Sequence, residues 1–275
     1  MHGWIILDKP LGMGSTQAVG AIKRLLREAD EPKTKVGHGG TLDPLASGVL
    51  PIALGEATKL AGRMLDATKE YAFTVAFGAQ TDTLDGEGKV IATSDIRPTL
   101  AQIEAVLPRF TGPIQQIPPA YSALKIDGKP AYARARAGEA VEMKPREVIV
   151  TEIKIVKKGE GFKNSAAPLP PPGGEGRDEG SSMLGEITLT ATVSKGTYIR
   201  SLARDIARAL GTVGQVSMLR RTRAGPFALD QAQKLDFLEQ SAKARQLTRM
   251  VLPLRAALDD IPALPVTPDQ ARLLR

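Results

Sequence analysis

The chain of 275 residues is 42% hydrophobic, which is typical of a folded protein with one large domain or two modest ones. It has no cysteine, which excludes disulfides, thiolate zinc sites and a cysteine nucleophile. Its two histidines disfavour a histidine-rich metal site but leave an all-carboxylate magnesium site open. The formal net charge of +7 favours an anionic partner, with nucleic acid the leading candidate and an ordinary basic enzyme the alternative.

Apolar periodicity predicts the elements of the first third of the chain. Residues 4–7 form an apolar run that predicts a buried strand, followed by a turn. A helix capped by Ser15 or Thr16 is predicted next. Its apolar positions follow helical spacing at Val19, Ile22, Leu25 and Leu26. Every second residue from 71 to 77 is a large apolar or aromatic side chain, and this alternation predicts a strand.

The middle of the chain predicts further strands around one helix. Apolar spacing over residues 100–107 indicates the helix, and an Asp-Gly pair at 127–128 indicates a tight hairpin. Strands are predicted at 147–156 and 186–194. Between them, residues 161–185 hold four prolines and six glycines, which predicts a disordered insertion, with a proline-rich docking site as the weaker alternative.

The last third predicts a helix from Thr197, ended by Gly211, and then a short strand over residues 216–219. Helical pieces are expected near residues 235–238 and 247–254, and a short polar helix after Pro268. The irregular alternation of strands and helices, with hairpin signals, predicts an α+β fold with a mixed, mostly antiparallel sheet.

One turn in the chain is suited to chemistry. Residues 39–48 place a single carboxylate, that of Asp43, among glycines, serine and proline. Pro44 favours an extended backbone at Asp43, and the glycines permit a close approach of the backbone to a ligand. A carboxylate held there can act as a nucleophile or base, although an Asp that only hydrogen-bonds its own turn fits equally well. A hydrolase triad of Asp43 with His38 and Ser47 is disfavoured because one loop holds all three.

Arg200 lies in the first turn of the predicted helix, where the helix dipole disfavours a cation. We therefore expect it to have a carboxylate or phosphate partner, and Asp43 is our candidate. A bidentate pair would fix the rotamer of Asp43 and keep its carboxylate ionised. The alternative is an exposed arginine without a special role.

Two further side chains and one charged stretch fit an RNA substrate. Tyr71, at the start of its strand, can stack on a base, with an ordinary cross-strand aromatic as the alternative. His38 flanks the glycine-rich turn and could also contact the RNA. The alternative is a surface or core histidine whose hydrogen bonds are satisfied within the protein. Between residues 194 and 223, seven basic side chains accompany one acid, Asp205, so a phosphate backbone would bind this stretch favourably.

Eight segments carry a family resemblance, and the longest reads GHGGTLDPLASGVL at residues 37–50. The others are residues 3–10, 55–59, 69–71, 81–85, 116–125, 194–200 and 219–221. Together they resemble the pseudouridine synthases, and in particular the bacterial TruB type. The match runs in order from residue 3 to about residue 235, apart from the insertion. The resemblance implies the pseudouridine synthase fold.

The resemblance also implies a reaction on uridine 55 in the T-loop of tRNA. The N1–C1′ bond is cleaved, the uracil turns, and C5 joins C1′, without a cofactor or a metal. Asp43 matches the catalytic nucleophile, Arg200 the residue that pairs with it, and Tyr71 the aromatic that stacks on the base and is implicated in removing the C5 proton. Whether the aspartate attacks C1′ or takes a ribose proton stays open. The predicted substrate-binding residues are His38, Tyr198, Leu219 and Lys9, and the predicted phosphate contacts are Arg204, Arg208, Arg220 and Arg221.

The resemblance sets the remaining expectations. Residues 1–230 are predicted to form the catalytic domain, and residues 231–275 an incomplete RNA-contacting extension. The expected partner is tRNA, through its T-arm, and we expect a monomer. No apolar run reaches the length of a membrane span or has signal-peptide flanks, so we expect a cytoplasmic protein without membrane association. Two alternatives are a synthase for another RNA and a non-catalytic tRNA-binding folding helper.

Overall fold

The computed structural model describes residues 1–126, 128–156, 182–258, 261–262 and 264–273. Its strands are β1 (Gly3–Lys9), β2 (Val36–His38), β3 (Ala46–Leu54), β4 (Lys69–Phe77), β5 (Ala79–Thr81), β6 (Val90–Thr93), β7 (Gly112–Gln116), β8 (Lys125–Ile126), β9 (Lys129–Pro130), β10 (Arg146–Ile155), β11 (Glu186–Val193), β12 (Gly214–Ala224), β13 (Phe227–Ala228) and β14 (Gln233–Lys234). Its α-helices are α1 (Ser15–Glu28), α2 (Ala61–Asp66), α3 (Leu100–Val106), α4 (Ala131–Arg136), α5 (Ile199–Ala209), α6 (Leu235–Lys243) and α7 (Pro268–Leu273). Short 3-10 helices cover Gly55–Leu60, Leu107–Phe110, Leu229–Gln231, Leu247–Met250 and Leu254–Ala257.

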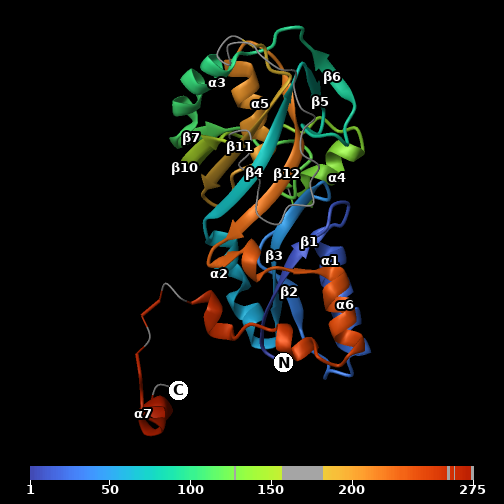
Figure 1. Cartoon of the computed structure of the whole chain (residues 1–275), viewed down its shortest axis with the longest axis vertical. Coiled ribbons are helices and arrows are strands. Elements are labelled where there is room, and N and C mark those ends of the chain that lie inside the picture. The colour runs from blue at the N-terminus through green and yellow to red at the C-terminus, as the bar shows by residue number, and fades with distance from the viewer. Residues whose placement is uncertain (127, 157–181, 259–260, 263, 274–275) are drawn as a thin grey trace.

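A ten-stranded sheet runs through the molecule (Figure 1). Its strands follow the order β14-β1-β3-β12-β4-β11-β10-β7, with β13 paired to β12 and β2 paired to β3. The pairs β1–β14 and β3–β12 are parallel, and the other pairs in this sheet are antiparallel. The predicted α+β fold with a mixed, mostly antiparallel sheet is confirmed.

The apolar run at the start of the chain forms β1, which is buried on both faces. Side chains alternate across a strand, so Ile5 and Leu7 join the larger core of the molecule while Trp4 and Ile6 join a smaller one. In the smaller core the rings of Trp4 and Phe227 lie with their centroids 5.5 Å apart. Two covered faces explain why the run is continuous rather than alternating.

Helix α5 packs its apolar face against the middle of the sheet and so points its N-terminus at the β2–β3 connection. Leu202, Ala203 and Ile206 are fully buried in the larger core. Gly211, with a φ of +75°, follows the helix and ends it as predicted. This placement brings the first turn of α5 to residues 39–45, which we call the Asp43 loop.

One local prediction is wrong, and another is confirmed as a strand but is too short. Helix α1 has Gly14 as its N-cap instead of Ser15 or Thr16, because the Ser15 hydroxyl hydrogen-bonds the backbone N–H and carbonyl of Leu42. The strand predicted at 216–219 is part of the 11-residue strand β12. Its continuation carries Arg220 and Arg221, which are predicted to contact phosphate and are buried in the sheet.

Most of the predicted insertion, residues 161–181, lies outside the described residues, as does Asp127 of the predicted hairpin. The strands that flank the insertion, β10 and β11, pair antiparallel with each other. Near the C-terminus, β14 joins the main sheet beside β1, and α6 lies beside α1 (Figure 1), where Arg24 forms an ion pair with Glu239. In the described part of the chain, no helix has the length and apolar character needed to cross a bilayer. The domain boundary at residue 230 stays a prediction.

Candidate active site

Asp43 lies in the loop between β2 and β3, with its side chain 39% exposed. Two glycines shape this connection and the strand after it: Gly40 in the loop has a φ of +129°, and Gly48 in β3 has a φ of +101°, a region that other residues rarely adopt. At Gly48 a Cβ atom would lie 2.2 Å from the carbonyl oxygen of Arg221. The glycines therefore let β3 and its preceding loop lie tightly against β12.

Arg200, in the first turn of α5, reaches Asp43 as predicted. Its Nη2 lies 2.8 Å from Oδ2 of Asp43, and its side chain is only 6% exposed. The expected bidentate pair with Asp43 is not formed. The second terminal nitrogen, Nη1, pairs with a different carboxylate and lies 3.3 Å from Oδ2 of Asp85. The two nitrogens also donate to the carbonyl oxygens of Thr83 (2.7 Å) and Tyr121 (2.9 Å). Two carboxylates and two carbonyls thus fix the guanidinium.

Asp85 is the site residue that our reasoning from individual residues missed. Its side chain is 7% exposed, and its Oδ1 accepts hydrogen bonds from the Thr83 hydroxyl (2.6 Å) and the Glu87 amide (3.1 Å). Leu84, between Thr83 and Asp85, has a φ of +64°. The sequence offered only the 81–85 segment of the family resemblance, which contains Asp85 and a second acid, Asp82. A buried aspartate needs a cation or several donors, but the burial of Asp85 is visible only in the structure.

The sheet register places Leu219 of β12 beside the start of β3, and Tyr71 of β4 on the far side of β12. Leu219 of β12 pairs with Ala46 at the start of β3, and Arg221, two residues on, pairs with Gly48. On the other side of β12, Tyr71 of β4 pairs with Arg221. Tyr71 is partly buried against the larger core. These contacts join the loop, β12 and the start of β4 into one region.

His38 and Tyr198 flank the loop and Arg200. His38 ends β2, and burial, followed by the charge of Arg221, lowers the pKa of its imidazole. Its buried Nδ1 has no hydrogen-bond partner among the described residues. Tyr198 is the N-cap residue of α5, and burial raises the pKa of its phenol. Both side chains are partly buried, and their roles as substrate contacts stay predictions.

Four of the predicted ligand contacts are buried and are engaged inside the protein. Lys9 is fully buried, and its ammonium donates to the carbonyls of Met13 (2.6 Å), Pro10 (2.9 Å) and Pro44 (3.4 Å), so its contact with substrate stays a prediction. Burial lowers the pKa of this amine to about 8.

Three of the four predicted phosphate contacts are also buried and bonded within the protein, and their contact with RNA stays a prediction. Arg204 and Arg220 are each 8% exposed and Arg221 is 1% exposed. Arg204 pairs with Asp205 at 2.8 Å, and Arg220 pairs with Asp8 at 2.9 Å. Arg221 donates to backbone carbonyls instead. Arg208 is exposed, and its contact with phosphate stays a prediction.

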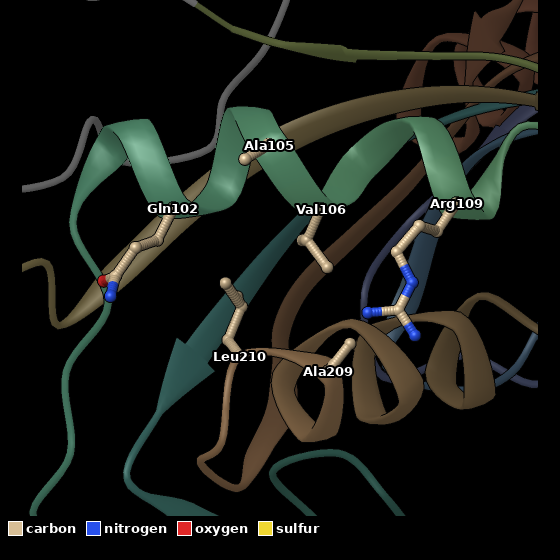
Figure 2. A pocket seen from close by; sticks show the side chains of 6 residues that line it. All are labelled: Gln102, Ala105, Val106, Arg109, Ala209 and Leu210. Atoms are coloured by element: carbon tan, nitrogen blue, oxygen red, sulfur yellow. The ribbon is translucent and has the colours of Figure 1, made fainter.

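A hollow of about 300 Å³ opens between α3 with its following 3-10 helix and the C-terminal end of α5 (Figure 2). Val106, Ala209 and Leu210 form its apolar part, and the side chains of Gln102 and Arg109 lie at its two ends (Figure 2). Arg200 is in the first turn of α5, ten residues before Leu210, which is a rise of about 15 Å. The hollow is therefore separate from the Asp43 site.

Comparison with known proteins now gives the family. The model for the TruB family pseudouridylate synthase N-terminal domain matches residues 23–199, and that for the tRNA pseudouridylate synthase B C-terminal domain matches residues 200–259. Over 275 residues the chain is 58% identical to tRNA pseudouridine synthase B of Novosphingobium aromaticivorans, covering 100% of this chain and 84% of that protein. The chain belongs to the TruB family. It is 56% identical to the protein of the same name from Zymomonas mobilis, covering 100% of this chain and 83% of the relative.

Solved structures support the TruB-family fold. Cbf5 in a crystal structure of a Cbf5–Nop10–Gar1 complex is similar, with a TM-score of 0.63 and 29% identity. The match covers 93% of this chain and 61% of the solved chain, so the present chain spans about three fifths of that length. The predicted family, the pseudouridine synthase fold and the enzyme class are confirmed.

Proposed function

We propose that this TruB-family enzyme converts uridine 55 in the T-loop of tRNA to pseudouridine. Uridine and pseudouridine are isomers, so the N1–C1′ bond that breaks is replaced by a C5–C1′ bond. The proton lost from C5 is balanced by the one gained at N1, and no further reactant is required. The observation that carries the proposal is the half-exposed carboxylate of Asp43 held at 2.8 Å by a buried arginine.

Asp43 has the geometry for a reaction at the ribose. One oxygen of its carboxylate, Oδ2, contacts Arg200, while 39% of the side chain remains exposed to a ligand. Because Arg200 is itself fixed by Asp85 and two carbonyls, the carboxylate is oriented before the substrate binds. A negative charge there stabilises positive character at C1′ as the glycosidic bond breaks, whether Asp43 attacks C1′ or takes a ribose proton.

Tyr71 and Arg208 account for the binding of an extruded nucleotide. Taking a base out of a folded RNA loop costs a few kcal/mol. Stacking of the base on the ring of Tyr71 would return about 1–3 kcal/mol of this. The exposed cation of Arg208 and the net charge of +7 favour the phosphate backbone.

The substrate assignment rests on the relatives. Proteins named tRNA pseudouridine synthase B match the full length of this chain at 58% and 56% identity. We accordingly place the protein in the cytoplasm, where tRNA is processed. Another RNA is the second candidate, because a TM-score of 0.61 and 27% identity relate the chain to an H/ACA ribonucleoprotein structure bound to a substrate RNA.

Tritium release from RNA labelled at C5 of uridine tests the proposal. An unmodified tRNA transcript should release one tritium per molecule, and a transcript in which uridine 55 is replaced by cytidine should release none. Release from the replaced transcript, or only from ribosomal RNA, would contradict the assignment of uridine 55. Binding of tRNA without any release would favour the folding helper over the enzyme.

A further inference from the structure

Side chains from three other elements hold the backbone of the Asp43 loop. Ser15, the first residue of α1, accepts a hydrogen bond from the Leu42 amide at 2.8 Å and donates to the Leu42 carbonyl at 3.0 Å. The ammonium of Lys9, at the end of β1, lies 3.4 Å from the Pro44 carbonyl. Arg221 of β12 donates to the carbonyls on the N-terminal side of Asp43. The loop is therefore fixed by groups outside it on both sides of Asp43.

Arg221 makes the most extensive of these contacts. Its Nη2 lies 3.2 Å from the carbonyl oxygen of Gly40, and its Nη1 lies 3.4 Å from that of Thr41. Its Nε donates to the carbonyl of Val49 at 2.7 Å, beyond the other end of the loop. One planar guanidinium thus bridges the entrance of the loop and the strand that follows it.

The burial of Arg221 is costly and is not offset by a carboxylate. The residue is 1% exposed, and among the described residues no acidic side chain forms an ion pair with it. A buried cation without a counter-charge is unfavourable by several kcal/mol unless its hydrogen bonds are satisfied. An apolar side chain of similar volume would fill this position at less cost, so packing alone does not account for the arginine.

The residue that carries this guanidinium lies between the two strands next to the site, β3 and β4. In the register of β12, Arg221 is opposite Gly48 on one side and opposite Tyr71 on the other. Its backbone therefore lies between the strand that follows Asp43 and the strand that begins near Tyr71.

We infer that Arg221 is a positioning residue that sets the conformation of the Asp43 loop and thereby aims the carboxylate at the ribose. The inference rests on the proposed role of Asp43. In this role Arg221, at 1% exposure, acts through the loop and not through contact with the substrate. It satisfies the carbonyls of Gly40, Thr41 and Val49 and holds the loop in one geometry. An error of about 1 Å in such a group can slow a reaction about a hundredfold.

Arg221→Met tests the inference, because methionine keeps an unbranched side chain but donates no hydrogen bond. Single-turnover tritium release with saturating excess enzyme is the readout, since the rate constant then does not depend on the amount of enzyme and a partly unfolded fraction leaves it unchanged. We expect the rate constant to fall about tenfold or more, with the Kd for tRNA changed by less than about threefold. The matched control is Arg245→Met, which removes a surface arginine paired with Asp30 and should keep the parent rate constant. A folded Arg221→Met variant with the parent rate constant would overturn the inference.

Ser15→Ala gives a second test if Arg221→Met does not fold. Loss of its two bonds to Leu42 should loosen the same loop and lower the rate constant by about threefold or more. In both variants, amide hydrogen exchange of the peptide covering residues 39–50 should speed up in the free enzyme, while that of β11 stays unchanged. This measurement needs no RNA, so it separates failure of the inference from failure of the proposed function. Unchanged exchange in the loop would contradict the positioning role.

Discussion

Replacing Arg200 with lysine tests how pairing of one guanidinium with two carboxylates contributes to the reaction. In the structure one terminal nitrogen lies 2.8 Å from Asp43 and the other lies 3.3 Å from Asp85, while both also donate to backbone carbonyls. A lysine ammonium presents its donors from a single point, so it can replace the contact with one carboxylate but not the fork between two. The variant keeps the positive charge and loses the orientation of Asp43.

The size of the effect follows from the bonds that are lost. A hydrogen bond to a charged group contributes about 1.5–3 kcal/mol, and about 1.4 kcal/mol corresponds to a tenfold change in rate. Loss of one such bond in the transition state predicts a rate constant about 10- to 100-fold lower. The Kd for tRNA should change little, because Arg200 is only 6% exposed and lies behind Asp43.

Single-turnover tritium release with excess enzyme measures this rate constant directly. Arg24→Lys is the matched control, since the same change is made at a surface arginine of α1 paired with Glu28 and Glu239. It should react at the parent rate. If the rate constant of Arg200→Lys is within about twofold of the parent's, the claim that the Arg200 guanidinium orients Asp43 is refuted.

Three further predictions follow from the geometry. Asp85→Asn removes the second carboxylate from Arg200, so single-turnover release should slow about tenfold at an unchanged tRNA Kd, and a parent-like rate constant would show that Asp85 does not hold the arginine. Burial lowers the pKa of Lys69 from 10.5 to about 8, so the unfolded chain binds more protons between these values and the free energy of unfolding should rise with pH there. Urea titrations at pH 8 and pH 10.5 measure this rise, which should be smaller by about 1 kcal/mol or more in Lys69→Met than in the parent. An equal rise in the free energy of unfolding of both proteins would contradict the prediction. Phe227→Ala should lower the free energy of unfolding by about 3–5 kcal/mol, because the ring is fully buried against Trp4, and a loss below about 1 kcal/mol would be inconsistent with that packing.

The pair at the centre of the site could be predicted from sequence because it depends on local rules. A proline after Asp43 and an arginine in the first turn of a helix are both visible in the chain, and an arginine there needs an anionic partner. The position of Asp85 depends instead on a left-handed residue, Leu84, and on a partner that only the folded chain brings close. Individual residue types give no signal for that contact.

The fold was predictable where the apolar pattern is strong, as in the continuous run of β1, the alternation of β4 and the helical spacing of α5. The burial of three cations near the site was not predicted: the structure places Lys9, Arg220 and Arg221 in the interior, against carbonyls and Asp8. Burial of a charged side chain depends on acceptors that come from distant segments, so a single sequence does not show it. The length of β12 was underestimated for the same reason.

Asp43→Asn provides the most direct test of the central claim, that the carboxylate of Asp43 performs the chemistry at the ribose. Asparagine keeps the size of the side chain and one of its oxygens but carries no negative charge. With tRNA labelled at C5 of uridine, the variant should bind with a Kd close to that of the parent and release no tritium, while the parent releases one tritium per tRNA. Tritium release by a folded Asp43→Asn variant at the parent rate would contradict the account.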